Sequence, residues 1–199
     1  LRGILGPGTN RMNLYVIRRA TRGLAAYLNG KYETPSVVIA YDSRKNSRLF
    51  AEETAAVLRG NDIEVFLFSD IAPVPLLSFS IGQLNASMGV MITASHNPRI
   101  FNGYKVYNSS GYQIVGEEAD SILKEINKLD YFEETERRYE GIHYVGRELS
   151  AAFLDKIVSL STVRGNPSCC RNLSVVYTPL NGAGNRYVRE AFRRIGIGC

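Results

Sequence analysis

Several residue types that mark other protein classes are scarce in this sequence. It contains no tryptophan, two histidines and three cysteines. Cys169, Cys170 and Cys199 are odd in number and lie late in the chain, which fits a reducing cytoplasm better than a disulfide framework. A zinc site is not indicated, because His96 and His143 are distant from the cysteines in sequence.

Long apolar runs are also absent. No run reaches the roughly 18 residues that a membrane-spanning helix requires. The first residues show no signal-peptide pattern. We therefore expect a cytoplasmic protein that acts without a membrane partner.

The formal net charge of +5 is unevenly distributed. Acidic residues are concentrated between residues 117 and 140, so the rest of the chain is more basic than the total suggests. Its basic residues are scattered singly, as at Arg2, Arg11, Arg44, Arg99 and Lys105. This pattern favours small anionic ligands over a nucleic-acid partner. A merely solvated basic surface would produce the same charge pattern.

Continuous apolar runs alternate with amphipathic segments in the first half of the chain. Strands are predicted at 37–41, 63–68 and 88–92. The two intervening helices are expected at 47–59, with Ser47 as the N-cap, and at 73–82. This βαβαβ order predicts an α/β fold, a three-layer αβα sandwich with a mostly parallel sheet.

Further elements extend this unit on both sides. A helix is expected at 13–28, before the first strand, and an acidic helix at 117–129. Alternating residues at Tyr104–Asn108 and Gly111–Val115 predict a β-hairpin, an antiparallel edge of a mixed sheet. Residues 141–146 fit a short strand. We assign residues 1–148 to one α/β domain.

The remaining residues, 149–199, read as a linker helix and the start of a second domain. A helix is predicted at 150–160, a linker at 165–167, a strand at Leu173–Tyr177 and a helix ending near Ile195. One strand and one helix cannot close a core. The chain also opens at Leu1 as though within a strand. We therefore expect it to be an incomplete part of a longer polypeptide.

The stretch Thr93–Pro98 is the strongest candidate site. It follows the apolar strand at 88–92 and turns at Asn97-Pro98, because proline disfavours helix for the residue before it. A hydroxyl on a turn at the end of a strand is exposed at the edge where open α/β sheets bind ligands. Asn102-Gly103-Tyr104-Lys105 follows soon after.

The string T-A-S-H-N-P followed by N-G-x-K resembles the phosphoserine loop of the α-D-phosphohexomutases, the phosphoglucomutase and phosphomannomutase family. Leu1-Arg2-Gly3 resembles the end of the family's F-G-T-x-G-L-R-G opening, and Gly8–Asn13 is also similar to the family. Residues 176–184 resemble its V-x-T-P-L-x-G-x-G second-domain opening, with Asn181 where histidine is common.

The resemblance implies a phosphosugar mutase that moves a phosphoryl group between the 1-position and the terminal position of a sugar phosphate, through a sugar bisphosphate. It implies Ser95 as the phosphoserine and a metal ligand, with His96 as its neighbour. It implies Lys105 as the group that handles the sugar hydroxyl's proton and Arg2 as an arginine near the transferring phosphate. Phosphate-binding residues by the same comparison are Asn97, Arg44 and Arg11.

The resemblance also implies two small-molecule requirements, Mg²⁺ and a sugar bisphosphate activator. The family's other metal ligands lie in a D-x-D-x-D-R loop that this chain lacks, so they are expected outside it, and the 199 residues alone should be inactive. The sugar and the oligomeric state stay open. Two other interpretations are weighed: a non-catalytic sugar-phosphate-binding module, and a serine hydrolase using Ser95 and His96, which lacks the G-x-S-x-G motif.

Overall fold

A computed structural model describes residues 1–162 and 173–197. It contains a six-stranded sheet of order β1-β5-β4-β2-β3-β6. Strand β2 pairs in parallel with β3 and β4, and β3 pairs in parallel with β6, whereas β5 runs antiparallel to both β4 and β1. The strands are β1 (Arg2–Ile4), β2 (Ser36–Tyr41), β3 (Glu64–Phe68), β4 (Met88–Ile92), β5 (Phe101–Asn108) and β6 (Ile142–Val145).

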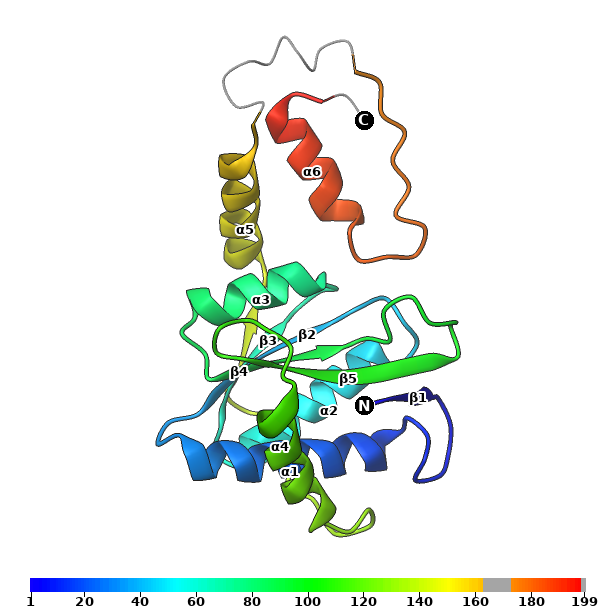
Figure 1. Cartoon of the computed structure of the whole chain (residues 1–199), viewed down its shortest axis with the longest axis vertical. Helices are drawn as coiled ribbons and strands as arrows, with labels where there is room; N and C mark the ends of the chain where they lie inside the picture. Colours follow the sequence, from blue (N-terminus) through cyan, green and yellow to red (C-terminus); the bar gives the residue numbers. More distant parts are fainter. Residues whose placement is uncertain (163–172, 198–199) are drawn as a thin grey trace. The chain divides into compact units, whose positions relative to one another are not determined.

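The chain divides into two compact units, Leu1–Val145 and Gly146–Cys199. The first unit contains the whole sheet and the helices α1 (Leu14–Lys31), α2 (Ser47–Gly60), α3 (Val74–Gln83) and α4 (Gly116–Asn127). Helix α3 covers one face of the sheet, and α1, α2 and α4 cover the other (Figure 1). The predicted three-layer αβα sandwich with a mixed sheet is therefore confirmed.

The central strands form because their apolar runs are continuous. All residues of β2 and β4 are buried, as expected for parallel strands covered by helices on both faces. Helix α1 contributes Ile17, Leu24 and Leu28 to the same core from its inner face. The bounds of β4 are those predicted from the sequence, and the short strand predicted near residues 141–146 is β6.

The second unit contains two described helices, α5 (Arg147–Leu160) and α6 (Asn185–Ile195). They meet through the rings of Phe153 and Tyr187, whose centroids are 6.3 Å apart. The hydroxyl oxygens of Ser150 and Tyr187 are 3.3 Å apart in the same contact. This helix pair is the packed part of the unit.

One predicted strand is formed only in part and another is not formed. The segment Gly111–Val115 turns back on the end of β5, with one antiparallel bridge between Tyr107 and Gln113 and backbone hydrogen bonds from Asn108 to Tyr112 and from Ile114 to Val106, but it is too short to count as a strand. Strand β5 is an interior strand and not an edge, because β1 pairs with its first residues on the side away from β4. Residues 175–179 adopt no regular structure, and Val176 is almost fully exposed. The predicted linker at 165–167 lies outside the described residues.

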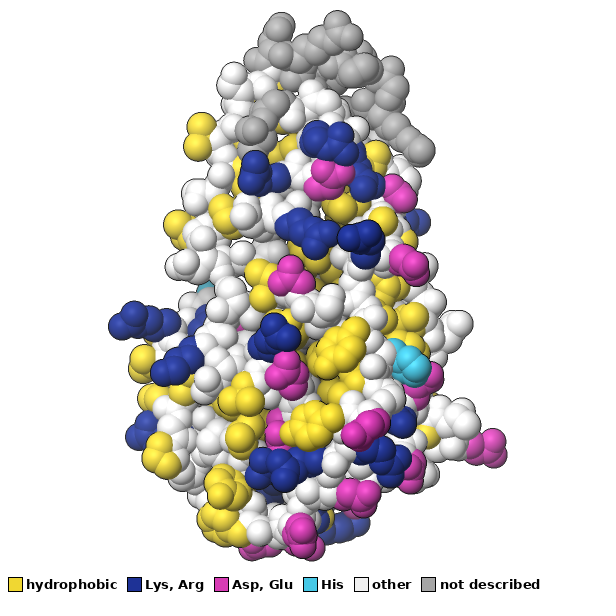
Figure 2. All heavy atoms as spheres, turned by 180° about the vertical axis from the view of Figure 1, so that it is seen from behind, with side chains coloured by type: hydrophobic (Ala, Val, Ile, Leu, Met, Phe, Trp, Pro, Cys, Tyr) yellow, Lys and Arg dark blue, Asp and Glu magenta, His cyan; other side chains and the backbone are white. Residues whose placement is uncertain are grey.

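The surface of the described residues carries mixed charge. On the face shown in Figure 2, Lys and Arg side chains are interspersed with Asp and Glu side chains. Apolar rings are exposed between them on the same face. Among the described helices, none is both long enough and apolar enough to cross a bilayer.

Candidate active site

The candidate site lies where the chain leaves β2 and β4. These neighbouring strands are parallel, so their carboxyl ends share one edge of the sheet. The chain continues from β2 through α2 to β3, and from β4 to β5 on the opposite side. Such divergence opens the crevice in which open α/β sheets bind ligands. Asp42 follows β2, and the serine loop (residues 93–100), which contains the predicted stretch Thr93–Pro98, follows β4.

Ser95 occupies an exposed turn of this loop, as predicted. Its φ of 57° places it in the left-handed region, which costs a non-glycine residue roughly 1–2 kcal/mol. The turn is held because the Ser95 N–H donates to Thr93 Oγ1 at 2.9 Å and the Asn97 N–H donates to the Ala94 carbonyl at 3.2 Å. The hydroxyl Oγ of Ser95 lies 3.3 Å from His96 Nδ1 and is otherwise open to solvent.

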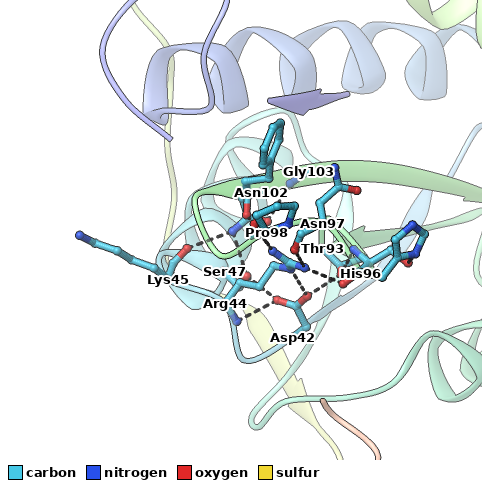
Figure 3. A network of polar contacts seen from close by, with 12 residues as sticks. Asp42, Arg44, Lys45, Ser47, Thr93, His96, Asn97, Pro98, Asn102 and Gly103 are labelled. Atoms are coloured by element: carbon cyan, nitrogen blue, oxygen red, sulfur yellow. Dashed lines mark hydrogen bonds and ion pairs between the residues drawn. The ribbon is translucent and has the colours of Figure 1, made fainter. Parts of the chain in front are cut away.

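Asp42 anchors the loop to β2 and α2 (Figure 3). Its carboxylate accepts hydrogen bonds from Thr93 Oγ1, from Ser47 Oγ at 2.7 Å and from the Arg44 N–H at 3.0 Å. The expectation that Ser47 caps α2 is therefore wrong. The capping position is Asn46, with a φ of 66° and no side-chain hydrogen bond, and the Ser47 hydroxyl faces Asp42 instead.

Arg44 extends from β2 beneath the serine loop. Its Nη2 donates to the carbonyls of Ser95 and Asn97, each at 2.6 Å. Its Nη1 donates to the carbonyls of Pro98 at 3.0 Å and Phe101 at 3.1 Å. The remaining nitrogen, Nε, lies 3.3 Å from Asp42 Oδ2, and the Arg44 side chain is only 13% exposed. The structure thus places Arg44 against the loop backbone.

In the N-G-x-K string, the first two residues, Asn102 and Gly103, have structural roles in packing. Asn102 is fully buried, and its amide donates to the Lys45 carbonyl and to Ser47 Oγ, both at 3.0 Å. Gly103 is required because a Cβ there would lie 2.5 Å from the Thr93 carbonyl oxygen. Together they bring the start of β5 against α2 and the end of β4.

Arg2 and Lys105 reach the same side of the sheet. Arg2 pairs with Gly103 across β1 and β5, and Lys105 is two residues further along β5, so both side chains share one face. Arg2 Nη1 donates to Asn97 Oδ1 at 2.9 Å. Burial, and to a smaller extent the charge of Arg2, lowers the pKa of Lys105 below its ordinary value. The Lys105 amine is therefore easier to deprotonate than that of an ordinary lysine.

The loop that contains Arg11 is held by one side chain. The Asn13 amide donates to the carbonyls of Gly6 and Gly8, each at 2.9 Å, while its Oδ1 caps α1 by accepting from the Val16 N–H at 3.1 Å. The Leu5 N–H donates to the Ile100 carbonyl, which ties this loop to the serine loop. No described residue pairs with the Arg11 guanidinium, and its predicted role stays a prediction.

Three residues that were not predicted as site residues complete the site. Thr93, Ser47 and Asn102 all hydrogen-bond into the network around Asp42. Thr93 and Asn102 belong to the two strings that marked the site, and Ser47 was predicted as a helix cap, but nothing in the sequence indicated Asp42 as the centre of their network.

The described residues do not build a metal site by themselves. They contain no group of three or more His, Cys, Asp or Glu side chains that could hold a metal ion. Both oxygens of Asp42, the acidic residue nearest in the fold, already accept hydrogen bonds. The Ser95 hydroxyl, or a phosphate attached to it, could supply one oxygen ligand.

Comparison with known proteins places this chain in a family. Residues 1–133 match the family model described as phosphoglucomutase/phosphomannomutase, alpha/beta/alpha domain I. The chain therefore belongs to the phosphoglucomutase/phosphomannomutase family. This agrees with the resemblance seen in the serine loop.

Individual relatives extend the similarity beyond the first unit. A probable phosphomannomutase of Haemophilus influenzae is 34% identical over 190 residues, which are 94% of this chain and 38% of that protein. A phosphoglucomutase of Staphylococcus haemolyticus is 34% identical over 199 residues, 99% of this chain and 36% of that protein. The chain thus spans less than half the length of these relatives.

A solved structure shares the fold. The crystal structure of a putative phosphomannomutase from Thermus thermophilus matches 99% of this chain and 42% of that chain, with a TM-score of 0.83. Sequence identity is 24%, so the match describes the fold.

Proposed function

We propose that this chain is the phosphoserine-bearing part of a phosphosugar mutase. The observation that carries the proposal is the exposed Ser95 hydroxyl, held on a left-handed turn at the carboxyl end of β4 within a family-matching domain. The mutase would move a phosphoryl group between the 1-position and the terminal position of a sugar phosphate. The sugar itself is left open.

In this mechanism a phosphate on Ser95 is the group that is lent to the substrate. The Ser95 Oγ–P bond breaks as a bond forms between phosphorus and a sugar hydroxyl oxygen, and the hydroxyl proton passes to Lys105 Nζ. The bisphosphate then turns around and returns its other phosphoryl group to Ser95 Oγ. Lys105 gives the proton back to the sugar oxygen that is released.

The surrounding residues support these steps through charge and position. The lowered pKa of Lys105 increases the fraction of neutral amine that can accept a proton. Arg2, which is fixed by Asn97, and the free guanidinium of Arg11 would balance the phosphate charge of roughly −1.5 to −2. His96 lies beside the Ser95 hydroxyl and is placed to hydrogen-bond a phosphate oxygen there.

The proposal includes Mg²⁺ and a sugar bisphosphate activator. A bound Mg²⁺ would neutralise charge on the transferring phosphoryl group. Ser95, once phosphorylated, offers one oxygen ligand, and the other ligands would come from residues outside these 199. By the same reasoning the 199 residues alone would not isomerise a sugar phosphate.

A serine hydrolase is less well supported by the geometry. His96 is the neighbour of Ser95 in sequence, and its Nε2 has no orienting partner among the described residues. A catalytic triad needs such a third group to fix the base.

The first test is phosphate on Ser95 in the complete gene product. After incubation with Mg²⁺ and glucose 1,6-bisphosphate, peptide mass spectrometry should find one phosphoryl group on Ser95, and the protein should interconvert the 1-phosphate and terminal-phosphate isomers of a sugar. Ser95→Ala should lose both signals and keep the circular dichroism of the parent. The 199-residue chain should show no turnover under the same conditions.

Three results would count against the proposal. Undiminished turnover in Ser95→Ala would remove Ser95 from the mechanism. Turnover by the 199-residue chain would place the metal site within it. Binding of sugar phosphates without turnover or phosphoserine would favour the non-catalytic binding module.

A further inference from the structure

All N–H groups of the Arg44 guanidinium face acceptors of the protein itself. An arginine side chain has five N–H donors. Four of them bind backbone carbonyls at 2.6–3.1 Å, those of Ser95, Asn97 and Pro98 in the serine loop and that of Phe101 at the start of β5. The fifth, on Nε, faces Asp42 Oδ2 at 3.3 Å. No donor is left for the phosphate of a substrate.

The direction of these carbonyls decides where the loop amides point. All peptide bonds are trans, so each peptide N–H is directed opposite to its carbonyl. The carbonyls of Ser95 and Pro98 face Arg44, so the N–H groups of His96 and Arg99 point away from it. Neither N–H has an acceptor among the described residues. The two amides are not consecutive, because the Asn97 N–H is bound to the Ala94 carbonyl and Pro98 has no N–H, so they are two separate donors available to an anion.

Asp42 fixes the guanidinium in place. Asp42 directly follows β2 and accepts a hydrogen bond from Ser47 at the start of α2. Its contact with Arg44 therefore holds the guanidinium in a fixed position relative to the sheet. Both side chains are largely shielded from water, with 14% of Asp42 and 13% of Arg44 exposed. The Arg44 backbone N–H also donates to Asp42 Oδ1 at 3.0 Å, so the two residues are joined by an ion pair and a hydrogen bond.

We propose that Arg44 is a positioning residue, which shapes the serine loop and does not bind the substrate's phosphate. It turns the loop carbonyls inward, holds Ser95 in its left-handed conformation and leaves the His96 and Arg99 amides directed outward for the phosphate on Ser95. The phosphate part of this inference rests on the proposed function. The shaping of the loop does not.

Two substitutions and one control separate the two roles. Arg44→Ala removes all the carbonyl contacts, and Arg44→Lys keeps the positive charge but replaces the planar fork with a single ammonium group. Arg48→Ala is the matched control, because Arg48 also lies near the start of α2, is exposed, and among the described residues forms an ion pair with Glu52 alone, in the next turn. All three are made in the complete gene product.

Hydrogen exchange of the loop amides is the first readout. In Arg44→Ala, exchange at the N–H groups of Asn97 and Phe101 should rise at least about tenfold, while amides of β2 stay protected. Arg44→Lys should resemble Arg44→Ala, and Arg48→Ala should resemble the parent. Unchanged loop exchange in Arg44→Ala would overturn the proposal, whether or not the protein is a mutase.

Phosphoryl transfer to Ser95 from glucose 1,6-bisphosphate is the second readout. Both Arg44 variants should lose rate by at least about a hundredfold at saturating bisphosphate, with the KM changed less than about threefold. A phosphate ligand predicts the opposite: an increased KM in Arg44→Ala that Arg44→Lys largely restores. That result would overturn the positioning role. If the parent takes up no phosphate, the proposed function fails, and the exchange measurement alone still decides the shaping of the loop.

Discussion

The two compact units of the chain differ in how much they bury. In Leu1–Val145, the central strands β2 and β4 are buried along their whole length, and helices cover both faces of the sheet. In the described part of Gly146–Cys199, only Ser150, Leu154 and Tyr187 are buried. Large apolar side chains are exposed in the same unit, namely those of Leu160, Leu173, Val176 and Leu180.

This difference in burial indicates that the first unit supplies most of the stability of the chain. Apolar burial is the main favourable term in folding and scales with the area removed from water. Nearly all of that burial, and every residue of the candidate site, belongs to the first unit. Stability and chemistry should therefore respond to substitutions in the first unit and be largely indifferent to those on exposed positions of the second.

Substitution of two leucines near the ends of helices should show the largest difference in stability between the two units. Leu58 in α2 is fully buried and Leu160 in α5 is 70% exposed. Leu58→Ala should lower the free energy of unfolding by about 2–5 kcal/mol, because it leaves a cavity in the core. Leu160→Ala should change it by less than about 0.5 kcal/mol. Urea denaturation followed by circular dichroism measures both, and similar losses would break the contrast between the units.

Two glycines test whether the tight packing of the first unit extends into the site. A Cβ at Gly103 would meet the Thr93 carbonyl at 2.5 Å, whereas a Cβ at Gly30 in α1 would meet nothing within 4 Å. Gly103→Ala should cost about 1–3 kcal/mol, because β4 or β5 must shift. Gly30→Ala should add about 0.5–1 kcal/mol of stability, since alanine favours helix. A harmless Gly103→Ala would show that the site is loosely packed.

The smallest effect concerns the charge of Lys105. Because its pKa is lowered in the folded state, the unfolded chain binds that proton more readily, and stability should rise with pH from the folded pKa towards the ordinary value of 10.5. Arg2→Gln removes the smaller of the two causes and should raise the pKa of Lys105 slightly, by NMR titration of its Nζ. Arg48→Gln should leave it unchanged. An unmoved pKa in Arg2→Gln would leave burial as the whole cause.

The layers of the fold could be predicted because burial on both faces leaves a direct mark on sequence. The uninterrupted apolar run of Met88–Ile92 can satisfy its backbone only as a covered strand, and the Asn97-Pro98 turn then fixes where Ser95 is exposed. The same logic succeeded only in part for Gly111–Val115, which pairs with the end of β5 as predicted but through one bridge and two backbone hydrogen bonds. Alternation describes faces and does not fix how far a pairing extends.

The contacts that hold the site could not be predicted in the same way. Arg44 binds backbone carbonyls, which every residue has, so nothing in the sequence of the loop marks its partner. Ser47 has the residue type and the position of a helix cap, yet a tertiary contact with Asp42 takes its hydroxyl. Such choices depend on which groups the fold brings together.

The connection that carries Ser95 has a consequence for the order in which the chain assembles. It joins β4 and β5, strands that pair from Ile92 with Tyr104 outward, whereas β2 with β4 and β3 with β6 join residues much further apart in sequence. The entropy lost on closing a loop grows with its length, so this hairpin has the least costly closure in the sheet. We therefore expect the serine loop to form before the longer crossovers are complete, and the docking of Arg44, which follows β2, to lock it later.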